Sequence, residues 1–557
     1  MTNSAGPDAS TPTATGAEAA AAPEWLGDPA LLAAFWRYER ALMTNDVPEL
    51  DELFARGLET IRSEAGSALV GHDAIAAFRA ARPPVPRRSL RRVHLRPVAE
   101  DAVVVVAESV RADRGTGTQT QLWQRIDGLW AVTVAHVSTV PGMQFSGLKL
   151  TTAEERAIWA TPEDRRPLVA SMAYPDGDDR VGALAGIRVA VKDLFAIAGE
   201  TIGAGNPAFR AGRTPERFTA PAVLALLRQG AEITGLAQTD ELAFSIAGTN
   251  VHYGTPPNPA APGHISGGST SGPASAVALG LADLALGTDT AGSIRVPGSY
   301  TGLYGLRTTH DAVSREGLVP LAPSFDTVGL LGRDLATLAT GARALLTTGP
   351  ARASRSEPIT RIVVDPALVA LADASSQLSF RAAVRALGLN SGADVVQSAG
   401  PEAIDPDALE RWFEAFRTAQ QFEAWQSDRT FVEANPGALE AAIAERFRVA
   451  STLTEQQVLD ARSVLARATT SLEALIPAGS ALALPATAGP APALDATAEE
   501  IDRVRGATLR LTCLASFSGM SALTLPYGRV GTLPVGLCVI GARGADLALL
   551  DLASSRA

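Results

Sequence analysis

Hydroxyl side chains and glycines gather in two short clusters of the sequence, GGSTSG at 267–272 and TDTAGS at 288–293. The first cluster opens a helix-like run from about Ser271 to Leu286, which places hydroxyls and free backbone N–H groups at the positive end of a helix. The second follows a strand-like run at 284–287, and consecutive N–H groups in a glycine-containing turn can bind a developing negative oxygen. These two clusters could therefore either bind a phosphate or present a serine hydroxyl for nucleophilic attack. Taken singly, each cluster is also typical of a flexible turn with a helix cap.

Lysine is nearly absent from the chain: only two of the 48 basic residues are lysines, Lys149 and Lys192. Arginine does not deprotonate in a protein, whereas a desolvated lysine can lose its proton and act as a base. Lys149 lies in a stretch typical of a linker. Lys192 follows the strand-like run 187–191, where a parallel strand would end at a site. Lys192 is therefore a candidate base, although a lysine can also survive here by accident of coding bias.

Spacing excludes three familiar kinds of site. A P-loop needs GxxxxGK[ST], and no lysine follows either cluster, nor does either match GxGxxG. A hydrolase triad with a late histidine is excluded because no histidine lies beyond 310, and Ser293 does not sit in a G-x-S-x-G turn. There is no HExxH motif, and Cys513 and Cys538 lie far apart, so no zinc site is predicted. Serine chemistry driven by a lysine remains.

Six separated motifs follow one another in the second part of the chain: VKDLFAIAGETIGAGNP (191–207), TDELAFSIAGTNVHYGTPPNP (239–259), GGSTSGPASAVALG (267–280), GTDTAGSIRVPGSYTGLYGLR (287–307), SFDTVG (324–329) and LPVGLCVIG (533–541). With these motifs in this order, residues 166–557 closely resemble the amidase signature family. The resemblance implies an α/β fold with a large mixed β-sheet flanked by helices. It also implies cleavage of carboxamide C–N bonds by a Ser–cis-Ser–Lys triad.

Matched residue by residue, the resemblance places the nucleophile at Ser293, the bridging cis-serine at Ser269 and the base at Lys192. A neutral Lys192 would take a proton from Ser269 as Ser269 takes one from the attacking Ser293. The relay run in reverse would protonate the leaving nitrogen, and water would then release the acyl group. We therefore expect these three side chains to lie within hydrogen-bond distance of one another.

The same resemblance assigns the oxyanion hole to the backbone N–H groups of Thr290, Ala291 and Gly292, together with that of the nucleophile. Ala291 departs from the usual T-G-G-S sequence of this turn, and alanine fits poorly there if the position requires a positive φ. Asp289 and Arg295 flank the turn. We expect them to form a buried ion pair that fixes it rather than to act as catalytic groups.

The segment from residue 25 to 140 predicts a small α+β domain, because helices come first and strands afterwards. The expected helices are 30–44, a short one after Val47-Pro48, and 73–81, and the expected strands lie near 89–98, 102–112, 118–127 and 130–140. Asp127-Gly128 is a typical hairpin turn between the last two strands.

This segment resembles the AtzH-like group of NTF2-like cone folds, through FWRYERALMTNDVPELDELF (35–54), GHDAIAAFRAARP (71–83) and LWQRIDGLWAVTVAHVS (122–138). Such folds hold a pocket between a curved sheet and helices, and some are enzymes while many only bind or dimerise. Candidate polar groups for the pocket are Tyr38, Arg62, Arg111 and His136. A histidine on an apolar strand such as His136 is, however, more typical of a core residue.

The chain therefore divides into four predicted parts: a disordered tail at 1–23, the AtzH-like domain at 24–140, a linker at 141–165 and the amidase domain at 166–557. From residue 166 onward, strand-like runs alternate with helices rich in alanine and leucine, a pattern typical of a mainly parallel sheet. Loops are expected at 350–357 and at 476–499, the second of which is rich in proline and alanine.

Composition limits the class of protein and its partners. With 46% apolar and 19% charged residues, the chain is neither disordered nor fibrous. The net charge of −11 argues against a nucleic-acid partner, and no apolar run is long enough to span a membrane. Two cysteines and the lack of a basic N-terminal segment favour a cytoplasmic location. No cofactor and no metal is expected, and a homodimer is possible.

The favoured function is hydrolysis of a small linear carboxamide through an acyl-enzyme, with release of ammonia. The substrate expected from the two resemblances is an aryl-acetamide or a ureido compound such as carboxybiuret or allophanate. Two alternatives stay open. One is a glutaminase-like amidotransferase subunit that passes ammonia to a partner, and the other is a binding protein with an inactive amidase fold.

Overall fold

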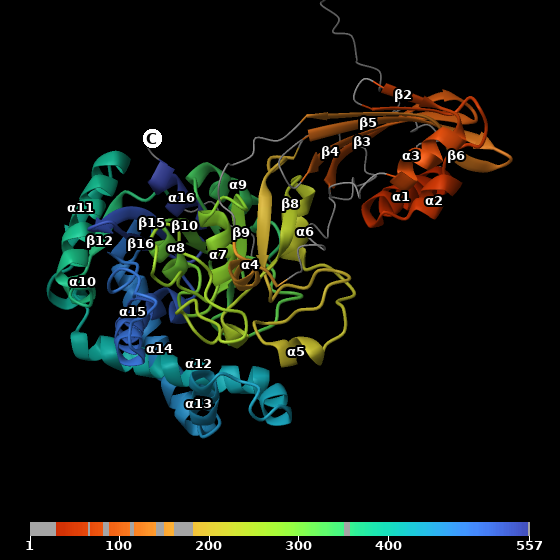
Figure 1. Ribbon diagram of the computed structural model, residues 1–557. Helices are drawn as coiled ribbons and strands as arrows, with labels where there is room; N and C mark the ends of the chain where they lie inside the picture. The colour runs from red at the N-terminus through yellow and green to blue at the C-terminus, as the bar shows by residue number, and fades with distance from the viewer. Residues whose placement is uncertain are drawn as a thin grey trace, which may run out of the picture. The chain divides into compact units, whose positions relative to one another are not determined.

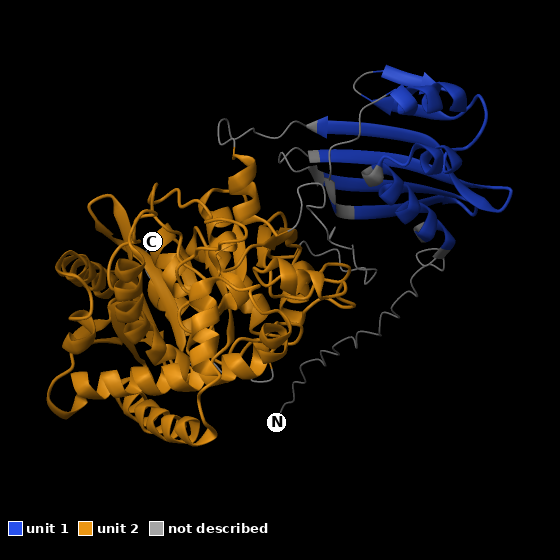
Figure 2. Cartoon of the chain, turned by 60° about the horizontal axis from the view of Figure 1, so that its bottom comes forward, with its two compact units in different colours: residues 1–144 blue, residues 145–557 orange. Residues whose placement is uncertain are grey.

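A computed structural model of the chain describes residues 29–64, 67–81, 88–111, 116–140, 150–160, 182–349 and 357–554. The chain divides into two units, residues 1–144 and residues 145–557, each with its own sheet and its own core (Figure 2). The predicted disordered tail at 1–23 lies outside the described residues.

In its described residues, the N-terminal unit combines three helices with a six-stranded sheet. The helices are α1 (Pro29–Thr44), α2 (Val47–Glu52) and α3 (His72–Ala81). The strands are β1 (Ile61–Glu64), β2 (Ser67–Val70), β3 (Arg88–Ala99), β4 (Ala102–Arg111), β5 (Thr116–Ile126) and β6 (Leu129–Val140), in the spatial order β2-β1-β6-β5-β4-β3. The helices lie along one face of the sheet (Figure 1), where Leu31 and Phe35 of α1 pack in one core with Trp123 and Val132.

The predicted order of helices and strands in this unit is confirmed. The hairpin between β5 and β6 turns at Asp127 and Gly128, whose φ angles of +50° and +82° are those of a tight two-residue turn. Strands β1 and β2 are not predicted from the sequence, because each has only four residues and neither shows a regular alternation of buried and exposed positions.

The larger unit is built on a ten-stranded sheet. Its strands are β7 (Arg188–Lys192), β8 (Glu232–Ala237), β9 (Leu284–Asp289), β10 (Tyr304–Arg307), β11 (Thr327–Gly332), β12 (Arg361–Val364), β13 (Asp394–Gln397), β14 (Ser480–Pro485), β15 (Ser521–Val530) and β16 (Leu533–Gly541). Its helices are α4 (Thr152–Ile158), α5 (Pro207–Ala211), α6 (Pro221–Arg228), α7 (Ser271–Ala278), α8 (Arg295–Thr301), α9 (Leu335–Leu345), α10 (Pro366–Val369), α11 (Ala374–Ser391), α12 (Pro406–Ala434), α13 (Ala441–Ala450), α14 (Glu455–Leu475), α15 (Ala498–Ser518) and α16 (Asp546–Ser554).

The sheet is mixed, in the order β13-β12-β14-β16-β15-β10-β11-β9-β7-β8. Parallel pairing is confined to its two ends, where β7 pairs with β8 and β9, and β12 pairs with β13 and β14. The strands between these ends are antiparallel to their neighbours. The mixed sheet implied by the family resemblance is therefore confirmed. The mainly parallel sheet expected from the alternation of elements is wrong, because β10–β11 and β15–β16 reverse direction within the sheet.

Helices cover both faces of this sheet. On one face, α6, α9, α11 and α16 share a core with the strands, through side chains such as Leu226, Leu338 and Leu549. Helices α7, α8 and α15 pack on the opposite face, and α12, α13 and α14 form a further layer against α15 (Figure 1). The face that carries α7, α8 and α15 is the one on which the two glycine-rich clusters lie.

Local predictions fail in two places in this unit. The helix-like run at 271–286 is a helix only as far as Ala278, because Gly280 adopts φ +77° and the chain re-enters the sheet as β9. Residues 476–499, predicted as a loop, contain the fully buried strand β14. A short run of alanine and leucine that is buried on both faces gives no periodic signal, which is why β14 is missed.

The core of the sheet predicts a measurable cost for a truncation at its centre. Leu284 of β9 is fully buried and contacts the α9 layer, so Leu284→Ala should reduce the free energy of unfolding by about 2–5 kcal/mol. Leu389→Ala on α11 is the control, because that side chain is 74% exposed and its loss should change little. Urea denaturation followed by far-UV circular dichroism measures both. Equal midpoints for the two variants would contradict this description of the core.

Candidate active site

Lys192, the last residue of β7, places its amine in the interior of the larger unit. The side chain is fully buried, and Nζ donates to Ser269 Oγ and to Thr288 Oγ1, each at 2.8 Å. Burial lowers the pKa of Lys192 to about 7, although nearby carboxylates, Asp240 foremost, act in the opposite direction. An amine with this pKa is partly neutral near pH 7 and is then able to accept a proton.

Ser269 joins the lysine to the second cluster. Its Oγ accepts a hydrogen bond from Lys192 and donates to Ser293 Oγ at 2.9 Å, so the three side chains form one continuous chain. The peptide bond between Gly268 and Ser269 is cis. All three side chains that the sequence selects are buried and lie within hydrogen-bond distance in the expected order.

Asp240, which the sequence analysis did not single out, packs directly against the backbone that carries Ser269. A Cβ added at Gly268 would lie 2.3 Å from Asp240 Oδ1, so glycine is required at 268. The backbone N–H of Gly248 donates to Asp240 Oδ2 at 2.9 Å. Burial raises the pKa of Asp240, against the influence of that N–H and of Lys192.

The turn after β9 carries Ser293 and the predicted oxyanion donors. Within the described residues, no protein acceptor takes the backbone N–H groups of Thr290, Ala291 and Ser293. The N–H of Gly292, by contrast, donates to Asp289 Oδ1 at 2.9 Å. The structure thus differs from the prediction at Gly292, whose N–H is already held by a carboxylate.

Backbone angles explain which residue types this turn accepts. Gly292 has φ +122°, and a Cβ there would lie 3.0 Å from Thr512 Cγ2. Ala291 is not among the residues with positive φ. Alanine at position 291 would fit poorly only if φ were positive there, and it is not. The turn is therefore intact although Ala291 replaces the first glycine of T-G-G-S.

Asp289 is the charged centre that holds the turn in place. Its carboxylate accepts from Arg295 Nε at 2.9 Å and Nη2 at 2.8 Å, and from Arg307 Nη1 at 3.1 Å, and all three side chains are fully buried. Burial alone would raise the pKa of Asp289, but the two guanidinium groups hold it well below its ordinary value. The expected Asp289–Arg295 ion pair is confirmed, and Arg307 is a second partner that the sequence did not reveal.

Hydrogen bonds from two other segments of the chain also hold this turn. Thr512 Oγ1, on α15, donates to the carbonyl oxygen of Ala291 at 2.6 Å, and Arg295 donates to the carbonyl oxygen of Thr512 at 2.7 Å. Thr290 Oγ1 donates to Asp326 Oδ1 at 2.6 Å. Asp326 belongs to the SFDTVG motif, which is the signal that points to it, whereas Thr512 lies in none of the motifs.

A small pocket adjoins Ser293. Its unfilled space, open solvent included, is about 280 Å³, which is small for a ligand site. Its walls are formed by Ala243, Phe244, Ser245, Ile246, Thr290, Ala291, Ser293, Leu321, Gln420, Arg505 and Leu509. No substrate-binding residue is predicted from the sequence. Gln420 and Arg505 come from the long helices α12 and α15, far from the motifs.

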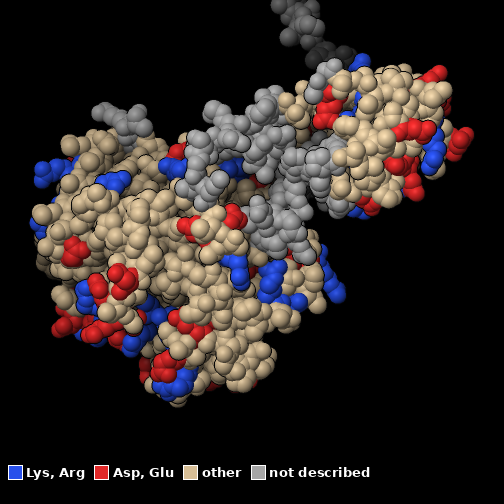
Figure 3. Space-filling view, viewed as in Figure 1, with Lys and Arg blue, Asp and Glu red and all other residues tan. Residues whose placement is uncertain are grey.

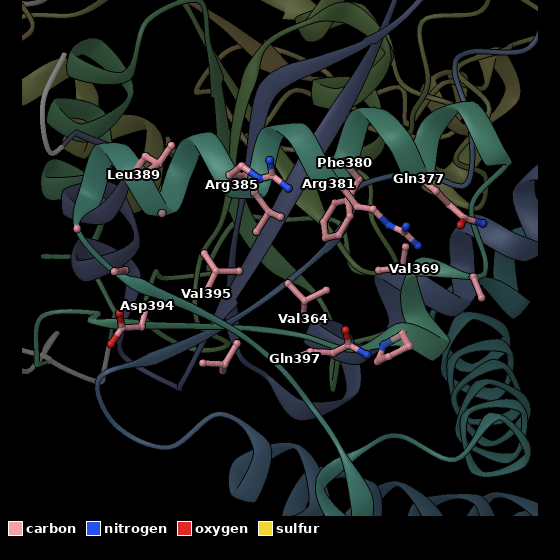
Figure 4. A pocket seen from close by; sticks show the side chains of 17 residues that line it. Val364, Val369, Gln377, Phe380, Arg381, Arg385, Leu389, Asp394, Val395 and Gln397 are labelled. Atoms are coloured by element: carbon pink, nitrogen blue, oxygen red, sulfur yellow. The ribbon is translucent and has the colours of Figure 1, made fainter.

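A second, larger hollow lies between α11 and the strands β12 and β13 (Figure 4). Arg381 and Arg385 project from α11, and Asp394 and Gln397 lie on the strand side, among mostly apolar side chains. None of its described lining residues is a serine, lysine, cysteine or histidine. Among its described lining residues, this hollow therefore lacks a nucleophile paired with a base.

The structure describes the side chains of three of the four candidates of the N-terminal unit, and it does not bring these three into one pocket. Tyr38 on α1 is buried, and its hydroxyl accepts from Gln119 Nε2 at 2.8 Å. Arg62 on β1 is also buried; it is hydrogen-bonded to Glu64, and its guanidinium lies 4.7 Å from the ring centroid of Phe78. Both side chains thus belong to the interior of this unit.

His136 lies on the opposite face of the sheet. Its side chain is exposed, and Nδ1 is 2.8 Å from the hydroxyl of Ser63, which follows Arg62 on β1 and therefore points to the other side. The interpretation of His136 as a core residue is wrong, because its strand is covered on one face only. The side chain of Arg111 lies outside what the structure describes.

Surface charge, helix hydropathy and the grouping of metal-binding side chains bear on which partners the protein can bind. On the face drawn in Figure 3, lysine and arginine are interspersed with aspartate and glutamate on both units, and the described residues there form no continuous basic surface. No described helix is both long enough and apolar enough to cross a membrane. Within the described residues, no group of three or more His, Cys, Asp or Glu is arranged to hold a metal ion.

Comparisons with known proteins agree with this geometry. Residues 168–550 match the family model "Amidase", and residues 26–142 match the family model "AtzH-like". Amidase 1 of Oryza sativa subsp. japonica is 35% identical over 389 residues, which are 66% of this chain and 89% of that protein. The 2-amino-5-chloromuconic acid deaminase of Comamonas testosteroni is 32% identical over 418 residues, 71% of this chain and 86% of that protein.

Solved structures give the same result. A chain described as "An unexpected vestigial protein complex reveals the evolutionary origins of an s-triazine catabolic enzyme" is 28% identical, with a TM-score of 0.62 over 72% of this chain and 94% of that chain. Another, described as "Crystal structure of amidase", is 29% identical, with a TM-score of 0.58 over 67% of this chain and 84% of that chain.

The chain belongs to the amidase signature family and carries an AtzH-like domain ahead of its amidase domain. It is an enzyme that hydrolyses carbon–nitrogen bonds of the amide class.

The buried ion pairs of Asp289 predict a large loss of stability on removal of its charge. Asp289→Asn would leave two guanidinium groups buried without a full counter-charge, and it should cost about 3–5 kcal/mol. Glu414→Gln is the control, because its pair with Arg417 is exposed and worth about 0–1 kcal/mol. Urea unfolding of both variants measures the difference. A loss below 1 kcal/mol for Asp289→Asn would show that the pair does not hold the turn.

Proposed function

We propose that the larger unit hydrolyses a small linear carboxamide, with Ser293 as nucleophile, Ser269 as proton relay and Lys192 as base. The observation that carries this proposal is the unbroken chain of contacts, 2.8 Å from Nζ to Ser269 Oγ and 2.9 Å from there to Ser293 Oγ. The lowered pKa of Lys192 supports the role of base, because a neutral amine has a lone pair to receive the proton.

The reaction runs through an acyl-enzyme. Neutral Lys192 accepts the proton of Ser269 while Ser269 accepts that of Ser293, and Ser293 Oγ attacks the amide carbon. When the tetrahedral intermediate collapses, the same relay returns the proton to the nitrogen, so ammonia departs and an ester remains on Ser293. A water molecule, deprotonated through the relay, then attacks the ester, and the carboxylic acid leaves.

The negative oxygen of the intermediate is received by backbone N–H groups. We assign this role to Thr290, Ala291 and Ser293, because these N–H groups have no acceptor within the described residues and all three residues line the pocket. Gly292 is left out because its N–H is donated to Asp289. One donor of this kind typically contributes about 10²–10³ in rate.

The acyl group is either an aryl-acetic group or a ureido group. The AtzH-like domain favours the ureido class, as does the likeness to a solved Kluyveromyces lactis allophanate hydrolase, 26% identical with a TM-score of 0.60. The small volume of the pocket supports a substrate with few heavy atoms.

The proposed site of action is the cytoplasm. This location is supported by Cys513 and Cys538, which are both free and buried.

The proposed oligomeric state is a homodimer formed through the N-terminal unit. It is supported by Ile61, Val70 and Val134, which are exposed apolar side chains at paired positions on β1, β2 and β6. Light scattering on the full chain measures the assembly.

Two substitutions test the assigned roles. Ser293→Ala removes the nucleophile, and Lys192→Arg keeps a charge but removes the base, so each should lower ammonia release by at least about 10³-fold. Lys149→Arg is the matched control and should retain activity, since it replaces the other lysine of the chain. The assay is ammonia release from a panel of primary amides and ureido acids, with circular dichroism as a check on folding.

Near-normal turnover by either variant would refute the assignment. Release of ammonia by the purified wild-type protein alone separates hydrolysis from transfer of ammonia to a partner.

The pKa of Lys192 predicts the direction of the pH dependence. Because the reactive form of the lysine is the neutral one, kcat/KM should rise with pH through an apparent pKa near 7 and level off above it. Between pH 5 and pH 6 the rise should be about tenfold. Initial rates of ammonia release from pH 5 to pH 9 measure the profile. A rate that is constant over this range, or that falls from pH 5 to pH 7, would contradict the neutral base.

A further inference from the structure

Arg505 of α15 lines the same pocket as Ser293 and has no counter-ion there. The structure records no ion pair and no hydrogen bond for this side chain with any described residue, and its Nε is buried without a partner. The described lining of the pocket contains no aspartate or glutamate. A guanidinium group thus borders the pocket with its donors unused.

The surroundings of Arg505 are unfavourable to an unpaired cation. Burial lowers the pKa of Arg505 to about 9, and the neighbouring Arg446 acts in the same direction. Asp502 attracts it only from a distance, since it is exposed and forms no ion pair with Arg505 in the described part of the chain. Arg505 is partly buried, and its Nε is buried without a partner. A charged group that loses part of its hydration is ordinarily paired, because the loss is otherwise not compensated.

Other arginines near this site have partners inside the protein. Arg446 donates to the carbonyl oxygen of Phe244 at 2.6 Å, and Arg295 is paired with Asp289. Arg505 differs from Arg446 and Arg295 because its N–H donors have no partner among the described residues. A planar guanidinium with free N–H groups matches the two oxygens of a carboxylate.

The rest of the pocket is suited to a short apolar spacer. Phe244, Ile246, Leu321 and Leu509 supply apolar walls. Side chains of this kind contact methylene groups well but offer no hydrogen bond to an anion.

We propose that the acyl group of the substrate bears a carboxylate, and that Arg505 binds this carboxylate while Ser293 attacks the amide at the other end. This specificity rests on the proposed hydrolysis at Ser293. The substrate class is accordingly a primary amide whose acyl chain ends in a carboxylate after a short spacer. Hydrolysis of such a compound adds one water, releases ammonia and leaves a dicarboxylate.

Matched pairs of amides test this specificity. Malonamate, succinamate and glutaramate are compared with 3-methylbutanamide, 4-methylpentanamide and 5-methylhexanamide, in which an isopropyl group replaces the carboxylate. For wild-type protein at least one acid should exceed its neutral counterpart in kcat/KM. In Arg505→Gln, the ratio for that pair should fall by about 10- to 100-fold.

Two further variants sharpen the comparison. Arg503→Gln is the matched control, because Arg503 lies on the same helix but is exposed and does not line the pocket, so its ratio should equal that of the wild type. Arg505→Lys keeps a charge without the planar pair of donors and should restore part of the preference. A wild-type preference for the neutral amides, or an unchanged ratio in Arg505→Gln, would overturn the proposal.

A second assay does not depend on turnover. A neutral alkyl fluorophosphonate should phosphonylate Ser293 with loss of fluoride, and malonate, succinate or glutarate should slow this labelling in wild-type protein but not in Arg505→Gln. If no dicarboxylate slows the labelling of Ser293, the proposed carboxylate specificity is wrong, but the proposed hydrolysis is not affected. Failure of Ser293 to react with the phosphonate, together with no turnover of any amide, would overturn the proposed hydrolysis itself and with it this inference.

Discussion

The site depends on one constraint, which is that the amine of Lys192 is removed from water and that its hydrogen-bond partners among the described residues are all hydroxyl groups. Its two acceptors are Ser269 Oγ and Thr288 Oγ1, and no carboxylate forms an ion pair with it within the described residues. A paired lysine would keep its proton at neutral pH, whereas a desolvated one gives it up more readily. Several features of the fold serve this constraint, since β7 ends at Lys192, β9 supplies Thr288 and the turn after Gly268 supplies Ser269.

Asp289, which directly follows the Thr288 that Lys192 contacts, is stabilised in its charged form in the same interior. Asp289 keeps its charge because Arg295 and Arg307 both bind its carboxylate, and the turn that presents Ser293 is anchored to it. Burial therefore lowers the pKa of the amine at Lys192, whereas paired guanidinium groups keep Asp289 an anion, and the number of charged partners decides between the two outcomes. By this reasoning an unpaired Arg505 in the pocket wall is the exception that calls for an anion from outside the protein.

Much of the fold was accessible from the sequence wherever a local pattern existed. The helices and long strands of the N-terminal unit follow from periodicity, and the motifs identify Lys192, Ser269 and Ser293, which the structure brings together. Strand β14 and the mixed direction of the sheet could not be read locally, because they depend on pairing between distant segments. The same holds for Arg505, which lies more than two hundred residues from Ser293 and in no motif. The occupied N–H of Gly292 depends on a side-chain contact that spacing does not encode.

The most direct test of the neutral lysine uses the fact that the chain has only two lysines. Protein labelled with carbon-13 at the lysine ε position should give two NMR signals, and Lys149→Arg assigns the one that remains to Lys192. We predict that the Lys192 signal titrates near pH 7, well below the ordinary lysine value of about 10.4. If the Lys192 signal titrates near that ordinary value of about 10.4 instead, Lys192 carries a proton throughout the working range and cannot be the base.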